Sequence, residues 1–76
     1  MFTAEYLRNL MSAHPFKPFR ICMSDGKSFD IPNHDAALVA RSYVEVARDP
    51  DEKGFADIFD RCAILHITRV EELQLA

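Results

Sequence analysis

The chain has 76 residues, a formal net charge of −3 and a hydrophobic content of 49%. This length fits one domain with a thin core, so we expect contacts between subunits to contribute to stability. The acidic balance argues against a broad nucleic-acid surface, and the sequence shows neither a signal-type apolar stretch nor a membrane helix, so we expect a cytoplasmic protein with no membrane partner.

The first predicted element is a helix over about residues 3–13. Thr3 is a residue type suited to the N-cap, and Glu5 would lie in the first turn, where the helix dipole favours a negative charge. Apolar residues recur at helical spacing from Leu7 onward. Pro15 disfavours helical geometry in the residue before it, so the helix is expected to end there.

A β-hairpin is predicted next, with Ser24-Asp25-Gly26 as its turn. A three-residue loop closed by a glycine bulge would pair Ile21 with Phe29 and would place Arg20 opposite Asp30 as a favourable charge pair. A two-residue loop would instead place Ile21 opposite Asp30 on the same face. We therefore predict the three-residue loop. The two predicted strands span about residues 19–23 and 27–31.

The rest of the chain is predicted to form further strands separated by polar breaks. Within them, Val44 and Val46 are expected to face the core. The charged segment 48–54 contains both Pro and Gly, so it is expected to be a solvent-exposed hairpin tip. Thr68-Arg69 is expected to form a corner before the last strand. The predicted strands span about residues 38–40, 43–47, 58–67 and 70–75.

These elements predict a mainly β fold with one N-terminal α-helix. About five short strands joined by tight hairpins are typical of a small, strongly bent antiparallel barrel. We expect one domain over residues 1–76, with the helix at about 3–13 and the barrel at about 19–75. A flat sheet covered by the helix is the alternative arrangement.

Three motifs resemble a family of short uncharacterised bacterial proteins: Pro-Phe-Lys-Pro-Phe-Arg at 15–20, Ser-Asp-Gly at 24–26 and His-Ile-Thr-Arg-Val at 66–70. This resemblance implies no activity. Met23–Lys27 and Leu65–Thr68 also resemble the first hairpin and the final corner of the Sm-like fold, a small barrel of the SH3-like kind. That second likeness implies a ring-forming protein that binds RNA, although a clear Asn- or Asp-centred base-binding loop is missing from the sequence.

The residues that could carry chemistry do not form a catalytic or metal-binding motif. The histidines and cysteines lack the close paired spacing of zinc sites. Both cysteines fall in apolar strands, so we expect reduced core thiols. We expect no enzyme, no cofactor and no metal, with His34-Asp35 as a turn or helix-cap element and His66 in a structural role. The residues considered are His14, His34, His66, Cys22 and Cys62.

The expected function is a non-enzymatic binding and oligomerisation module. Open strand edges would recruit a second copy or a protein partner by strand addition. The alternative is an Sm-like RNA-binding protein, in which cations flank an aromatic ring that stacks on a base. An Arg20–Asp30 pair, and a Tyr43 ring that covers a barrel edge or packs at a subunit contact, would explain the same residues structurally. The candidate nucleic-acid or partner surface comprises Lys17, Arg20, Arg41, Tyr43 and Arg69.

Overall fold

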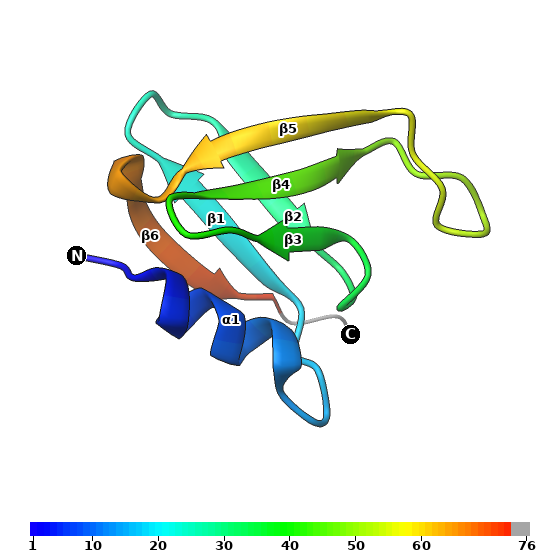
Figure 1. Ribbon diagram of the computed structural model, residues 1–76, viewed down its shortest axis with the longest axis horizontal. Helices are drawn as coiled ribbons and strands as arrows, with labels where there is room; N and C mark the ends of the chain where they lie inside the picture. Colours follow the sequence, from blue (N-terminus) through cyan, green and yellow to red (C-terminus); the bar gives the residue numbers. More distant parts are fainter. Residues whose placement is uncertain (74–76) are drawn as a thin grey trace.

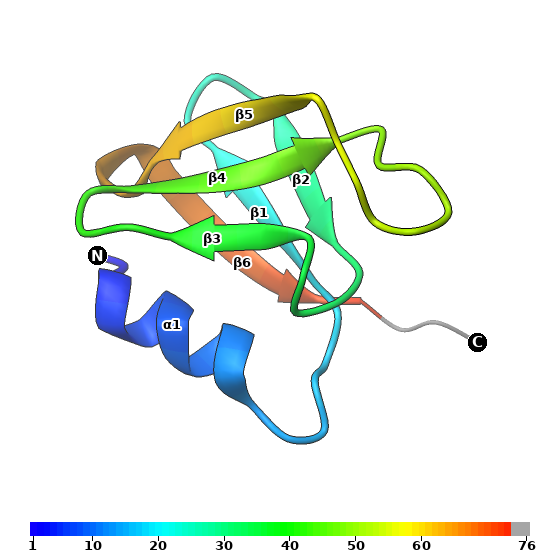
Figure 2. The same cartoon turned by 45° about the vertical axis from the view of Figure 1, so that its right-hand side comes forward.

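The computed structural model describes residues 1–73, which form one α-helix, six β-strands and one 3-10 turn (Figures 1 and 2). The mainly β fold with one N-terminal helix is therefore confirmed. The elements are α1 (Ala4–Ser12), β1 (Phe19–Met23), β2 (Ser28–Ile31), β3 (Ala37–Val39), β4 (Tyr43–Arg48), β5 (Ile58–Ala63), the 3-10 turn η1 (Ile64–His66) and β6 (Ile67–Glu72).

The helix α1 begins as the sequence predicted. The Thr3 hydroxyl accepts a hydrogen bond from the Tyr6 amide at 3.1 Å, which satisfies one of the free amides at the helix start. Leu7 lies on the inner side of the helix and is completely buried. The last helical residue is Ser12, shortly before Pro15. In both views α1 lies beside β3 and β6 (Figures 1 and 2).

The strands form two antiparallel sheets of three strands each, in the orders β2-β1-β6 and β3-β4-β5. Both sheets and α1 share one hydrophobic core. No strand ladder joins the two sheets within residues 1–73, so the closed barrel that we expected is not seen there. The buried core residues are Leu7, Phe19, Ile21, Ile31, Ala36, Val44, Val46, Cys62, Ile64 and Ile67.

The predicted register of the first hairpin is confirmed. Ile21 lies opposite Phe29, and Arg20 lies opposite Asp30. Gly26 adopts a φ of +91°, the left-handed conformation that a glycine bulge requires, and its amide donates to the Met23 carbonyl at 3.1 Å. Loop length and alternation were therefore sufficient to predict this register from the sequence. The inward positions of Val44 and Val46 in β4, which are 1% and 4% exposed, are confirmed as well.

The predicted corner near the C-terminus was wrong in position. The strand expected over 58–67 ends at Ala63, and the chain turns through η1 rather than at Thr68-Arg69, which lies inside β6. Cys62, Ile64 and Ile67 are all buried, so the interval between inward residues changes from two to three. A 3-10 turn has three residues per turn and keeps such positions on one side. The sixth strand arises earlier in the chain, where the stretch expected over 38–47 with an interruption at 41–42 forms the separate strands β3 and β4. The predicted strand end at residue 75 lies outside the described residues.

We predict that Gly26→Ala lowers the free energy of unfolding by more than about 1 kcal/mol, because an alanine at positive φ is strained. A Cβ at Gly26 would meet no atom within 4 Å, so the loss would reflect backbone conformation and not a steric clash. Urea unfolding measures the effect. Ser24→Ala in the same turn is the control and should stay close to wild type. Equal stability of Gly26→Ala and wild type would contradict the glycine-bulge assignment.

Candidate functional site

The histidines and cysteines do not gather into a chemical site. Both cysteines are free thiols, as expected, but only Cys62 belongs to the core, where it is 1% exposed. The prediction that Cys22 is a core residue was wrong, since its side chain is only half-buried. Phe19 and Ile21 take the inward positions of β1, and Cys22 lies on the other face because side chains alternate along a strand. Within residues 1–73, no group of three or more His, Cys, Asp or Glu residues is placed to hold a metal ion.

Cys62 is also unsuited to nucleophilic chemistry. Burial, with smaller contributions from Asp60 and Asp25, raises the pKa of its thiol to about 11. Because the thiolate is the reactive form, this thiol stays protonated and unreactive at neutral pH. Cys62 therefore acts as a small apolar core residue of β5.

The histidine side chains are exposed, and the two that we singled out lie in turns. The Asn33 side chain accepts a hydrogen bond from the Asp35 amide at 3.0 Å, which makes the segment around His34 a local turn. His34 Nε2 lies 3.6 Å from Asp35 Oδ1, and both side chains are exposed. His66 contributes through its backbone, since its carbonyl accepts from the Ser24 amide at 2.9 Å and ties η1 to the first hairpin.

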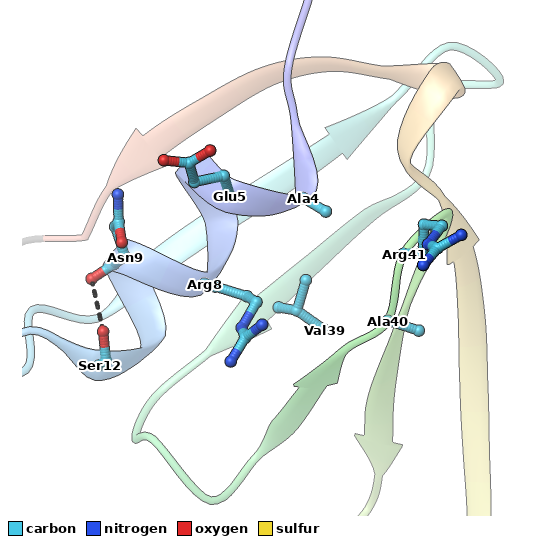
Figure 3. A pocket seen from close by; sticks show the side chains of 8 residues that line it. All are labelled: Ala4, Glu5, Arg8, Asn9, Ser12, Val39, Ala40 and Arg41. Atoms are coloured by element: carbon cyan, nitrogen blue, oxygen red, sulfur yellow. Dashed lines mark hydrogen bonds between the residues drawn. The ribbon is translucent and has the colours of Figure 1, made fainter.

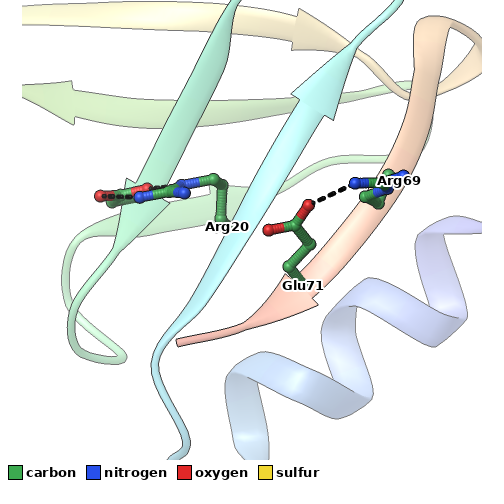
Figure 4. A network of polar contacts seen from close by, with 4 residues as sticks. Arg20, Arg69 and Glu71 are labelled. Carbon is green, nitrogen blue, oxygen red and sulfur yellow. Dashed lines mark hydrogen bonds and ion pairs between the residues drawn. The ribbon is translucent and has the colours of Figure 1, made fainter. Parts of the chain in front are cut away.

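Two residues of the predicted surface lie on the outer face of the β2-β1-β6 sheet. Arg20 donates to both carboxylate oxygens of Asp30, at 2.6 and 3.3 Å. Arg69 on β6 donates to Glu71 at 2.8 Å (Figure 4). The hydrogen bond from Arg20 holds the pKa of the Asp30 carboxyl below its usual value. Each arginine is thus paired with a carboxylate of its own sheet, and this face presents alternating charges.

The other three residues of the predicted surface lie elsewhere. Lys17 is in the exposed connection between α1 and β1, and Arg41 is in the exposed turn between β3 and β4. Tyr43 is on β4, where the Arg61 guanidinium lies over its ring at 4.1 Å from the centroid. The structure therefore distributes the five residues over four places and does not bring them together as one patch.

The free edge of β5, which we call the β5 edge (Ile58–Ala63), was not singled out from the sequence. Ile58 and Phe59 are 53% and 51% exposed, although they are consecutive in a strand and point to opposite faces. Phe55, just before the strand, is 74% exposed. The sequence signal for this edge was a pair of consecutive apolar residues at the start of a strand. Only the structure shows that both side chains stay exposed, one on each face of the sheet.

A second feature that the sequence did not indicate is an open groove between α1 and β3 (Figure 3). It has a volume of about 650 Å³ and continues into a neighbouring hollow of about 300 Å³ that shares Arg8, Ser12 and Val39 with it. We call both together the α1–β3 groove. Its main part is lined by Ala4, Glu5, Arg8, Asn9, Ser12, Val39, Ala40 and Arg41.

Comparisons of the chain with protein-family models, curated proteins and solved structures gave no match. Among the described residues, α1 has nine residues, and no helix combines the length and apolarity needed to cross a membrane. The geometry of the chain itself is therefore the basis for assigning its function.

We predict that a thiol reagent at neutral pH labels Cys22 of the native protein much faster than Cys62. Cys22 is partly accessible, whereas Cys62 is buried and its pKa of about 11 leaves very little thiolate. Mass spectrometry of labelled peptides measures both rates. In urea, both cysteines should label at similar rates, which serves as the control. Rapid native labelling of Cys62 would show that β5 is not packed as described.

The Arg20–Asp30 pair predicts a pH-dependent contribution to stability. The pKa of Asp30 is lower in the folded chain than its ordinary value, so the pair stabilises the fold above about pH 4 and this contribution is lost as the pH falls through the lowered pKa. Asp30→Asn should reduce the melting temperature slightly at pH 7, because exposed pairs contribute at most about 1 kcal/mol. The difference should disappear once the pH has fallen below the lowered pKa of Asp30. Ser28→Ala on the same strand is the control, and a difference that persists in acid would contradict this account.

Proposed function

We propose that this chain is a small non-enzymatic binding module that associates with further copies of itself through the β5 edge. The observation that carries this proposal is the exposure of about half of both Ile58 and Phe59 on a strand with one free side. Covering such side chains stabilises an interface by roughly 1 kcal/mol or more each. An exposed apolar edge strand is a surface that pairs with another strand.

The β5 edge is better suited to pairing with another copy than the free edges of β2, β3 and β6. β2 has four residues and is followed by Pro32, and β3 has only three residues. β6 pairs with β1 through a register shift near Met23, and Arg69 and Glu71 charge its surface. β5 has six residues in continuous register with β4 and contains neither Pro nor Lys. β5 is longer than β2 and β3, and its charged residues Asp60 and Arg61 are paired with Arg48 and Glu45 of β4, so its free side is open to pairing.

The backbone of β5 is also suited to strand addition. The Ala40 amide donates to the Tyr43 carbonyl, so the backbone amide and carbonyl of Tyr43 point toward β3. Because these directions alternate along a strand, the backbone groups of Val44 point toward β5. Val44 lies opposite Cys62, and the alternation therefore directs the amides and carbonyls of Phe59 and Arg61 away from β4. A strand of another copy could pair with these groups while its side chains cover Ile58 and Phe59 on the two faces.

We further propose that the two sheets are the halves of a strongly bent barrel of the Sm-like or SH3-like kind. The chain passes from one sheet to the other within a few residues. β2 ends at Ile31, and the Ala36 carbonyl already accepts at 2.9 Å from the amide of Ala47, which belongs to β4 of the second sheet. In this arrangement β5 and β6 are the terminal strands. Pairing β5 of one copy with β6 of the next would be a head-to-tail contact, which closes into a ring when the rotation allows it.

We predict that wild type self-associates and that an Ile58→Lys, Phe59→Lys double variant is monomeric, because lysine on an edge strand opposes pairing. Light scattering over a concentration series measures the mass. Leu65→Lys is the matched control, since Leu65 is 71% exposed but lies in η1 outside the β5 edge. Circular dichroism verifies that all variants fold. A monomeric wild type, or equal loss of mass in Leu65→Lys, would contradict the proposal.

A further inference from the structure

Arg8 and Arg41 differ from the other arginines of this chain. Four of its six arginines form ion pairs with carboxylates: Arg20, Arg48, Arg61 and Arg69. Within residues 1–73, Arg8 and Arg41 form no such pair, and both line the α1–β3 groove (Figure 3). They come from the helix and from the turn after β3. The groove therefore holds two arginines that are available to a carboxylate from outside the described chain.

The β3 side of this groove is a free strand edge with available backbone groups. The Ala36 carbonyl accepts from the Ala47 amide, and the Ala40 amide donates to the Tyr43 carbonyl. The backbone groups of Ala36 and Ala40 therefore point toward β4. By alternation, the amides and carbonyls of Ala37 and Val39 face away from β4. No backbone or side-chain hydrogen bond to these groups is found within residues 1–73, and both residues line the groove. An added strand would satisfy them.

The α1 side of the groove supplies polar side chains. Leu7 faces the core, whereas Arg8, Asn9 and Ser12 line the groove. Glu5 is the acidic residue of the main part, so the two arginines leave it with a net positive charge on a chain of net charge −3. This charge complements an acidic segment and repels a basic one.

We propose that the α1–β3 groove binds an extended acidic peptide segment, which adds to the free edge of β3 and places carboxylates on Arg8 and Arg41. Arginine binds carboxylates through paired, charge-assisted hydrogen bonds, and strand addition supplies the backbone hydrogen bonds. A peptide fits better than RNA because free backbone groups of β3 lie along the groove, whereas its described lining contains one aromatic ring, that of His34, and single-stranded RNA is bound by successive stacking on several rings.

Leu38 defines the chemistry of the segment further. It is 65% exposed and lies between Ala37 and Val39, so it projects from the outer face of the sheet. A strand beside β3 would present alternate side chains to Leu38 and to the α1 side. The segment that fits is therefore one in which acidic and apolar residues alternate. This site is separate from the β5 edge, so the two proposals can succeed or fail independently.

The test is fluorescence anisotropy at low salt with a labelled peptide of alternating Glu and Val. Wild type should bind, and Arg8→Gln and Arg41→Gln should each weaken binding by about tenfold, the loss expected for one charge-assisted contact. Arg69→Gln is the matched control, because it removes the same charge from a site outside the groove and should bind as wild type does. Thermal melting verifies that each variant folds.

Three further probes separate the mechanism from its alternatives. A Lys-Val peptide should not bind, and a Glu-Val peptide with N-methylated backbone amides should bind much more weakly, because it cannot pair with β3. The Ile58→Lys, Phe59→Lys variant should bind the Glu-Val peptide normally, whether or not it is monomeric. The proposal is overturned if wild type does not bind the Glu-Val peptide, if N-methylation has no effect, or if a short uridine oligonucleotide binds through Arg8 and Arg41 in its place.

Discussion

All elements of the fold depend on one small core shared by two sheets and a helix. β1 is the central strand of one sheet and β4 of the other, and their inward residues Ile21 and Val44 are 0% and 1% exposed. Leu7 of α1 is also completely buried. Because apolar burial is the dominant favourable term in folding, the outer strands are positioned by the shared core to which both central strands contribute.

The same core explains why the two proposed binding surfaces lie at strand edges. A chain of this size buries only about 60% of the surface of its unfolded form, so it cannot cover every strand that it forms. The β5 edge and the free edge of β3 remain open, and they differ in chemistry. Ile58 and Phe59 make the first apolar, whereas Arg8 and Arg41 make the second basic. A small domain can in this way present two edges to two different partners.

The charge distribution follows from cross-strand pairing. Arg20 with Asp30 and Arg61 with Glu45 join neighbouring strands, and both pairs are largely exposed. Exposed pairs contribute little to stability, but they neutralise the outer faces of the sheets. The two arginines that have no carboxylate partner within residues 1–73 both line the α1–β3 groove.

The sequence by itself determined the features that depend on a few neighbouring residues. Thr3 defined the helix start, and the glycine turn at Gly26 together with strict alternation fixed the register of the first hairpin. The corner at η1 was misplaced because a continuous apolar stretch does not show where its inward spacing changes from two residues to three. The tertiary structure alone decided that Arg8 and Arg41 line one groove beside β3 and that Ile58 and Phe59 stay uncovered. Local turn chemistry is encoded within a few residues, whereas these juxtapositions depend on how the shared core packs elements that are distant in the chain.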